Sequence, residues 1–141
     1  MIRVNPKICT GCRACEFACS FQRKKSFHYR FSLIRIQKDK EAEGFFVPNL
    51  CRHCADPPCA KDCPAGAIRR LESGRVAIDP QSCTGCGLCI QSCPWSVPVM
   101  GEEKIAEICD LCQGDPSCVQ FCQPGALRRE EAGGSGPGEQ G

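Results

Sequence analysis

Sixteen cysteines are the residues of this 141-residue sequence that could carry chemistry, and all of them fall into four groups of four. In every group three residues separate the third cysteine from the last. So many thiols in so short a chain are typical of a scaffold held together by disulfides or metal. The groups are Cys9, Cys12, Cys15 and Cys19; Cys51, Cys54, Cys59 and Cys63; Cys83, Cys86, Cys89 and Cys93; and Cys109, Cys112, Cys118 and Cys122.

The spacing within the groups favours iron–sulfur clusters over zinc. The first and third groups have the Cys-x2-Cys-x2-Cys-x3-Cys spacing of bacterial ferredoxins, in which three cysteines bind one cluster and the fourth binds its neighbour. The fourth cysteine comes about one helical turn after the third, which suits a ligand for a second cluster. Zinc sites usually combine cysteine pairs from two knuckles separated by a longer loop. We therefore predict four [4Fe–4S] clusters, with all sixteen cysteines as iron ligands.

Disulfide bonds are the other chemistry open to these cysteines, and they belong in oxidising compartments. The sequence begins Met1-Ile2-Arg3-Val4-Asn5-Pro6 and reaches its first cysteine without an apolar leader. No apolar run approaches the roughly 18–20 residues needed to span a membrane. We expect reduced thiolates in the cytoplasm, or in the periplasm only if a signal-bearing partner carries the chain there, and no direct membrane insertion.

The formal net charge of +2 counts every cysteine as neutral. Cluster ligation deprotonates thiols, and sixteen thiolates with four cores of about +2 each would bring the net charge to about −6. The scattered Lys and Arg residues would partly balance that charge. The sequence therefore predicts no nucleic-acid partner.

The residues around the cysteines resemble a known family, the four-cluster ferredoxin-like electron-transfer subunits of molybdenum and tungsten oxidoreductases. Relatives of this kind include the iron–sulfur subunits of dimethyl sulfoxide reductase, respiratory nitrate reductase and formate dehydrogenase. The resemblance covers roughly residues 3–128 and implies an α+β fold of two nested, bacterial-ferredoxin-like dicluster units, with short helices and small β-hairpins. It rests on residues 9–19, 51–59, 83–89, 93–95 and 109–112.

The resemblance also implies how the ligands divide among the clusters. The first and fourth groups would form an outer lobe, and the second and third groups an inner lobe. Nesting also follows from the loops, because 19 residues separate the second group from the third, but 31 separate the first from the second. The expected ligand sets are Cys9, Cys12, Cys15 and Cys122; Cys19, Cys109, Cys112 and Cys118; Cys51, Cys54, Cys59 and Cys93; and Cys63, Cys83, Cys86 and Cys89.

Two departures from the family pattern concern the outer lobe. Pro64 and Pro94 follow the inner groups and end their helical turns, but Ser20 follows Cys19 and Gln123 follows Cys122. These changes remove no ligand.

Short apolar stretches beside the cysteine groups predict the strands that position them. We expect a four-cluster domain over residues 1–129 and a disordered, glycine-rich tail over residues 130–141. The predicted strands are 2–4, 33–36, 45–47 and 76–78, with 67–68 and 126–127 at equivalent places after the second and fourth groups.

Residues 20–50 form the longest segment between groups, and they mix Phe21, Phe27, Tyr29 and Phe31 with Lys and Arg. Exposed aromatic residues and Arg favour interfaces, so one interpretation is a docking surface for a partner subunit. The other is a hairpin whose aromatic side chains cover a cluster and whose charges are solvated. The sequence favours the second interpretation, because an isolated run of charged residues is usually a solvated surface rather than a binding site.

Two single residues beside cysteines have simpler interpretations. His53 stands between Cys51 and Cys54, but each cluster already has four thiolates. We therefore expect His53 to pack or to hydrogen-bond near a cluster rather than to bind iron. Trp95 is expected to pack in the core near a cluster.

The sequence contains no nucleotide motif and no constellation of catalytic bases, so we predict no catalytic residue. We expect single-electron transfer in the iron–sulfur subunit of a larger oxidoreductase. The expected partners are a large catalytic subunit, most simply of a tungsten or molybdenum enzyme such as an aldehyde oxidoreductase, and a second electron carrier or further subunit. The alternatives are a freestanding polyferredoxin shuttle and a zinc-binding interaction module.

Overall fold

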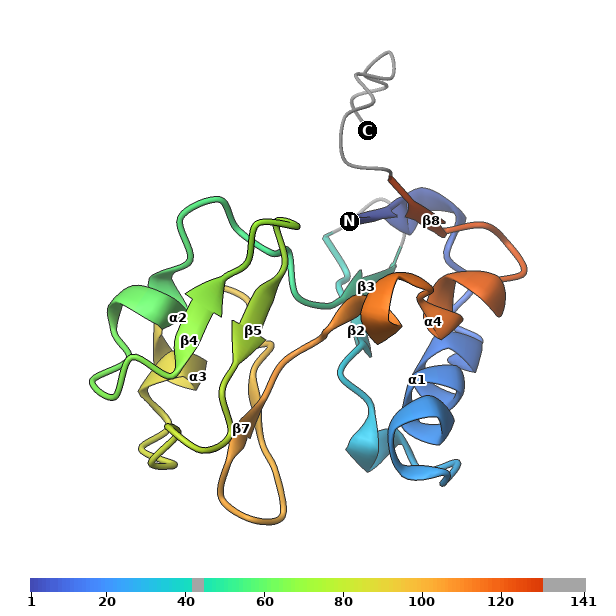
Figure 1. Ribbon diagram of the computed structural model, residues 1–141. Coiled ribbons are helices and arrows are strands. Elements are labelled where there is room, and N and C mark those ends of the chain that lie inside the picture. The colour runs from blue at the N-terminus through green and yellow to red at the C-terminus, as the bar shows by residue number, and fades with distance from the viewer. Residues whose placement is uncertain (42–44, 131–141) are drawn as a thin grey trace.

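Four pairs of short antiparallel strands and a few short helices make up residues 1–41 and 45–130, the part of the chain that the computed structural model describes (Figure 1). This mixture confirms the α+β fold class. The helices are η1 (Pro6–Ile8), α1 (Ala14–Lys24), η2 (Tyr29–Phe31), α2 (Pro58–Lys61), α3 (Leu88–Ser92), η3 (Leu111–Gly114) and α4 (Ser117–Gln120). The strand pairs are β1 (Ile2–Val4) with β8 (Leu127–Arg129), β2 (Arg35–Lys38) with β3 (Phe46–Asn49), β4 (Ile68–Arg70) with β5 (Val76–Ile78), and β6 (Val99–Met100) with β7 (Ala106–Glu107).

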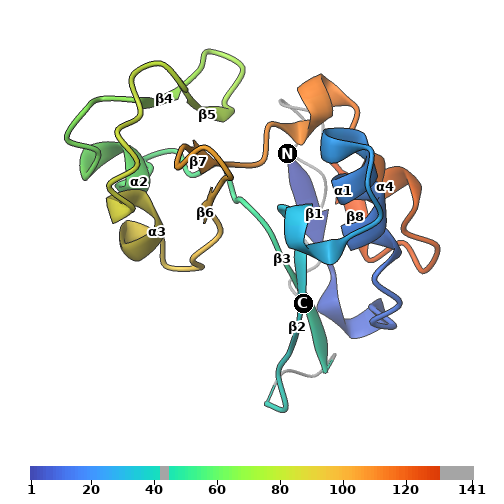
Figure 2. The same ribbon diagram turned by 90° about the horizontal axis from the view of Figure 1, so that it is seen from below.

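The pairing of β1 with β8 joins the beginning of the chain to residues near its end. Ile2 lies opposite Arg129, and Val4 lies opposite Leu127. Beyond the strands, the backbone N–H of Glu130 donates to the carbonyl oxygen of Met1 at 2.8 Å. The first and fourth cysteine groups are therefore held on the same side of the molecule, as Figures 1 and 2 show.

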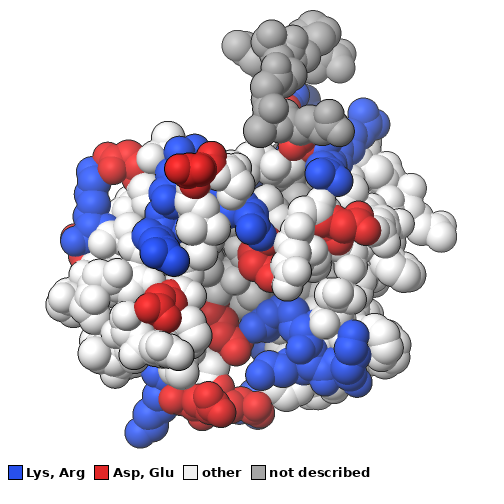
Figure 3. Space-filling model, viewed as in Figure 1, with Lys and Arg blue, Asp and Glu red and all other residues white. Residues whose placement is uncertain are grey.

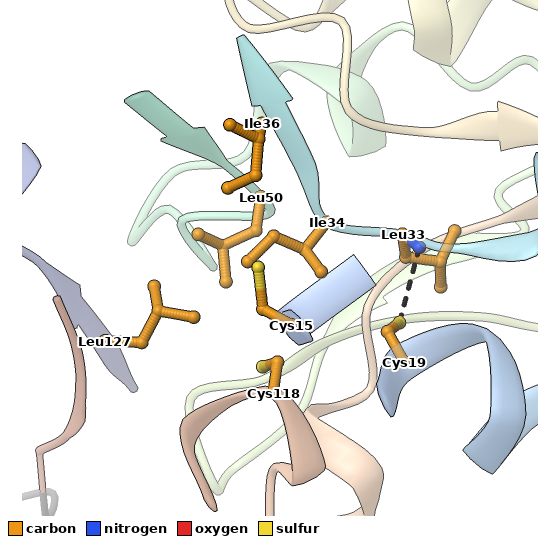
Figure 4. Close-up of a cluster of buried hydrophobic side chains, with 8 residues drawn as sticks. All are labelled: Cys15, Cys19, Leu33, Ile34, Ile36, Leu50, Cys118 and Leu127. Atoms are coloured by element: carbon orange, nitrogen blue, oxygen red, sulfur yellow. Dashed lines mark hydrogen bonds between the residues drawn. The ribbon is translucent and has the colours of Figure 1, made fainter. Parts of the chain in front are cut away.

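The buried side chains form two separate cores. One core combines residues from the two ends of the chain, and we call the part around it the outer lobe; the other combines residues between β3 and η3, and we call that part the inner lobe. The outer core consists of Cys15, Cys19, Leu33, Ile34, Ile36, Leu50, Cys118 and Leu127 (Figure 4). The inner core consists of Cys59, Ile68, Val76, Cys89 and Ala106.

Cysteines themselves fill much of both cores, because the chain has few large aliphatic residues to bury. A chain of this size with so little apolar surface depends on covalent or metal links for stability. The core arrangement therefore gives the thiols a structural role as well as a chemical one.

Helices α1 and α3 follow the same cysteine spacing but differ in length. Helix α3 ends at Ser92, and Cys93 is extended with φ −76° and ψ 121°, as expected for a residue before proline. No proline follows Cys19, and Ser20 is fully buried with its hydroxyl donating to the carbonyl oxygen of Phe17 at 3.0 Å. Helix α1 consequently continues to Lys24.

The predicted strands at 2–4 and 76–78 agree with β1 and β5. The strand predicted at 33–36 is placed too early, because Leu33 and Ile34 pack into the outer core as irregular backbone before β2 begins. The hairpin of β6 and β7 was not predicted. Of the predicted tail, Glu130 is paired with Met1, and residues 131–141 lie outside the described residues.

Candidate metal centres

Three hollows in the structure are each lined by four cysteines. In every case, three of the cysteines come from one group and the fourth is the last cysteine of another group. The hollows are lined by Cys9, Cys12, Cys15 and Cys122; by Cys51, Cys54, Cys59 and Cys93; and by Cys63, Cys83, Cys86 and Cys89. Each hollow thus brings together the cysteines of one expected ligand set.

The remaining four cysteines also lie near one another. Burial is the main cause that raises the pKa of the Cys109 thiol to about 12, and charge repulsion from Cys19 and Cys112 contributes. Burial likewise raises the pKa of Cys118, with further contributions from Cys109, Cys19 and Cys112. These mutual effects require the four sulfur atoms to share one region of the outer lobe.

The crowding of thiols has a chemical consequence. Burial is also the main cause that raises the pKa values of Cys15 and Cys51 to about 12. Without a compensating positive charge, adjacent thiolates in a water-poor site are unfavourable. A cationic iron–sulfide core would supply that charge, so the donor set fits a thiolate-ligated cluster.

Backbone amides already point at four of the sulfur atoms. Such hydrogen bonds stabilise thiolates, and hydrogen bonds to sulfur are one means by which a protein sets a cluster's reduction potential. The N–H of Leu33 donates to Cys19 Sγ at 3.4 Å (Figure 4), His53 to Cys51 at 3.4 Å, Ala67 to Cys63 at 3.3 Å, and Ala106 to Cys83 at 3.5 Å.

Glycine is required where the cysteine loops of the first and third groups contact the rest of the chain. Gly85 has φ +72°, and a Cβ there would lie 2.2 Å from the carbonyl oxygen of Lys104. Gly11, at the equivalent position, has φ +71° and would place a Cβ 2.7 Å from the ring of Phe46. Both loops therefore depend on the absence of a side chain, as expected for backbone in a left-handed conformation at close approach.

The cysteines differ in exposure in a regular way. Cys12 and Cys86 are exposed, whereas the other fourteen cysteines are buried or half-buried. These two residues occupy the same position in the first and third groups. The hollows that contain them therefore reach the molecular surface through equivalent ligands.

His53 is buried beside the second cysteine group. Its Nδ1 accepts a hydrogen bond from the backbone N–H of Val76 at 3.0 Å, so the proton of the neutral ring is on Nε2. Burial lowers the pKa of His53 to about 4, which keeps the ring neutral. Within the described part of the chain, Nε2 is buried without a hydrogen-bond partner. Glu16, next to Cys15, is also buried, and its Oε2 lies 3.7 Å from Nη1 of Arg13 in an ion pair.

Two sequence interpretations require correction. Phe21, Phe27 and Tyr29 are exposed and Phe31 is half-buried, and none of them lines the three cysteine hollows. Trp95 lines the hollow of Cys51 but is exposed, and Arg52 lies over its ring at 6.0 Å from the centroid. Tertiary contacts decide whether each aromatic side chain is exposed or buried, and the sequence pattern does not reveal those contacts.

Among residues 1–41 and 45–130, no three His, Cys, Asp or Glu side chains are arranged to hold a single metal ion. The ligands of a four-iron cube bind four different iron atoms, so their sulfur atoms do not converge on one point. A mononuclear zinc site would instead need four sulfur atoms about 2.3 Å from the same ion.

Residues 42–132 match the family model described as a 4Fe–4S dicluster domain. The chain belongs to this family. The match spans more than half of the chain and confirms the iron–sulfur, electron-transfer class predicted from the cysteines. Sixteen cysteines in a protein of this family fit four [4Fe–4S] clusters.

Curated relatives agree with the family assignment. The chain is 37% identical over 123 residues to the polyferredoxin-like subunit of aliphatic sulfonate oxidoreductase from Pyrococcus furiosus, and the match covers 86% of this chain and 70% of the relative. It is 31% identical to the thiosulfate reductase electron transfer subunit PhsB of Salmonella typhi, covering 86% of this chain and 70% of the relative. It is 31% identical to a tetrathionate reductase subunit of Salmonella typhimurium, covering 84% of this chain but only 52% of the relative.

A solved structure has the same fold. The structure described as the active site complex BamBC of benzoyl coenzyme A reductase contains a chain with a TM-score of 0.50 and 23% identity, and the match covers 91% of this chain and 74% of that one. Over the described residues, no helix is both long and apolar enough to cross a membrane.

Proposed function

We propose that this chain carries single electrons between the catalytic subunit of an oxidoreductase and a second electron carrier. When bound, [4Fe–4S] clusters supply one-electron redox chemistry. The observation that supports this function best is the set of three hollows, each lined by three cysteines of one group and the last cysteine of another. In bacterial ferredoxins, the same exchange of the last cysteine holds two clusters as a pair.

We further propose a four-cluster domain over residues 1–129, in which four cysteines that lie close together in space bind each cluster. Three sets are supported by the hollows, and the fourth is supported by the mutual pKa effects within it. The proposed sets are Cys9, Cys12, Cys15 and Cys122; Cys19, Cys109, Cys112 and Cys118; Cys51, Cys54, Cys59 and Cys93; and Cys63, Cys83, Cys86 and Cys89.

The sets have an order across the molecule. Cys51 contributes to the raised pKa of Cys109, so the two sets that contain these residues are neighbours across the lobes. Each of the remaining two sets includes an exposed cysteine, Cys12 or Cys86. Electrons would therefore be exchanged with partners near these two exposed ligands.

The catalytic partner is proposed to be a tungsten or molybdenum enzyme, with an aldehyde oxidoreductase as the simplest candidate. The support is the resemblance to such enzymes' electron-transfer subunits, together with relatives that are named as subunits of sulfonate, thiosulfate and tetrathionate enzymes. We propose the cytoplasm as its compartment, because reduced thiols persist there.

Anaerobic purification of the tagged chain from its native host, with analysis of every metal, tests this function. We expect about sixteen irons per chain, together with a large partner that contains tungsten or molybdenum. Sixteen irons on a chain without any partner would instead support the freestanding shuttle. Zinc without iron would refute the proposal.

A further inference from the structure

Four exposed aromatic side chains lie on helix α1, on the loop that follows it and at the first residue of η2, which packs against α1. We call them the aromatic face. Scattered apolar residues are normal on a protein surface, but a contiguous exposed group marks an interaction site. The fractions of their surface exposed are 41% for Phe17, 41% for Phe21, 68% for Phe27 and 54% for Tyr29.

The aromatic face is held in one conformation by contacts within the chain. The rings of Phe21 and Phe27 are stacked with their centroids 4.6 Å apart. Arg35 donates to the carbonyl oxygens of Tyr29, at 2.7 Å, and of Arg30, at 3.1 Å. Arg23 donates to the carbonyl oxygen of Phe31 at 2.5 Å. Rigid aromatic groups lose little conformational entropy on binding, so this arrangement is suited to an interface.

Helix α1 connects the aromatic face directly to the cysteine sites. Cys15 and Cys19 are buried, whereas Phe17 and Phe21 are exposed, and each pair has the four-residue spacing that defines one side of a helix. A helix with its side chains is about 10–12 Å across. A protein bound to the aromatic face would therefore lie about one helix diameter from two of the proposed ligand sets.

The inner lobe differs at the equivalent position. Trp95, two residues after Cys93 as Phe21 is two residues after Cys19, is also 41% exposed, but no stacked aromatic ring lies beside it among the described residues. Pro94 stops α3 immediately after the last cysteine of its group, whereas Ser20 lets α1 continue to Lys24. The extension carries Phe21 and begins the loop to Phe27. The departure from the family pattern at Ser20 therefore keeps Phe21 on the helix, four residues after Phe17.

Positive charge surrounds the aromatic face. Figure 3 shows Lys and Arg side chains gathered over the C-terminal end of α1, and Lys24, Lys25 and Arg30 are exposed there. The Lys25 ammonium lies 5.4 Å from the centre of the Phe21 ring. Complementary charge guides association and excludes wrong partners, so the matching surface should be apolar at its centre and acidic at its rim.

We propose that the aromatic face is the docking surface for the large catalytic subunit, through an apolar patch with an acidic rim. The proposal rests on the subunit role proposed above, because an electron-transfer subunit needs a permanent contact with its enzyme. Aromatic residues and Arg at the centre of such a contact carry a large share of the binding energy. The bound catalytic subunit would exchange electrons with the clusters beside Cys15 and Cys19. The exposed ligands Cys12 and Cys86 would remain further points of electron exchange.

The test uses a tagged full-length chain expressed in the native host and purified anaerobically as its complex. The variant F27S/Y29S removes the two most exposed members of the aromatic face. The control F121S removes a ring that is 59% exposed at the end of α4 and is not a member of the aromatic face. Iron content and the spectrum of the reduced clusters are measured beside the amount of tungsten- or molybdenum-containing subunit retained.

We expect F27S/Y29S to keep the wild-type iron content while the retained catalytic subunit falls at least tenfold, and F121S to retain it fully. R30E should also weaken retention. Wild-type retention in F27S/Y29S, or equal loss in F121S, would refute this docking surface but not the subunit role. A wild-type chain that purifies with clusters but no enzyme would refute the subunit role itself. A wild-type dimer that F27S/Y29S converts to monomer would assign the face to a second copy and overturn the proposal.

Discussion

Arg23 near the end of α1 and Glu107 on β7 form an ion pair between the outer and inner lobes, with Nη2 2.6 Å from Oε2. Lys24 Nζ lies 3.8 Å from the other carboxylate oxygen. A second link runs from Arg75 Nη1 to the carbonyl oxygen of Asp110 at 2.9 Å. These polar contacts fix how the two lobes face each other, and with them the separation of Cys51 from Cys109.

Glu107→Gln tests the contribution of the ion pair. Both partners are mostly buried, so we expect the variant to lower the stability of the cluster-loaded protein by about 1 kcal/mol. The measurement is the denaturant midpoint under anaerobic conditions. Glu103→Gln is the matched control, because Glu103 is exposed on the same hairpin. Equal midpoints for the two variants would show that the pair contributes nothing.

Gly85→Ala tests the close contact of the third cysteine group. The new Cβ would meet the carbonyl oxygen of Lys104 at 2.2 Å, so the loop or the β6–β7 hairpin must move. Gly66→Ala is the control, since Gly66 has φ +61° and open space around it, and the left-handed backbone alone costs about 1–2 kcal/mol. We expect G85A to lose iron from the inner lobe while G66A keeps it. Equal iron contents would mean that the contact is relieved without consequence.

Cys19→Ser and Cys122→Ser test the exchange of ligands in the outer lobe. The two cysteines are the last members of their groups, and the proposed sets assign them to different clusters. Each variant should therefore change the paramagnetic resonance signal of a different reduced cluster. If both variants alter the same signal, the two outer sets are wrongly assigned.

His53→Leu tests the buried hydrogen bond to β5. The change leaves the backbone N–H of Val76 buried without an acceptor, and such a group costs about 1–3 kcal/mol. Thermal unfolding of the loaded protein should show that loss of stability. His28→Leu provides the comparison, because His28 is the other histidine of the chain and is exposed. An unchanged H53L would show that a water or another group replaces the ring.

The cysteine spacing predicted the cluster chemistry, because spacing determines which thiols can share a site, and the family resemblance predicted the fold class. Prediction was weaker where tertiary contacts decide. Leu33 and Ile34 have a strand-like pattern, but the outer core takes both side chains before β2 begins. The exposure of Phe27 and Tyr29 depends on the length of α1, which Ser20 in place of proline permits, and on the hydrogen bonds of Arg35, which have no sequence signature. Strands β6 and β7 have two residues each, too few to give a periodic pattern.

The pairing of β1 with β8 determines the order in which the two lobes can fold during translation. The inner core draws its members from residues 59–106, whereas the outer core cannot close until residues 118 and 127 have left the ribosome. The first cysteine group is thus synthesised first, but the core around it forms last. Its thiols stay outside a folded core through most of translation. A nascent chain that stops before Cys109 contains every member of the inner core, but its first residues lack strand β8 and the later cysteines proposed to complete their ligand sets.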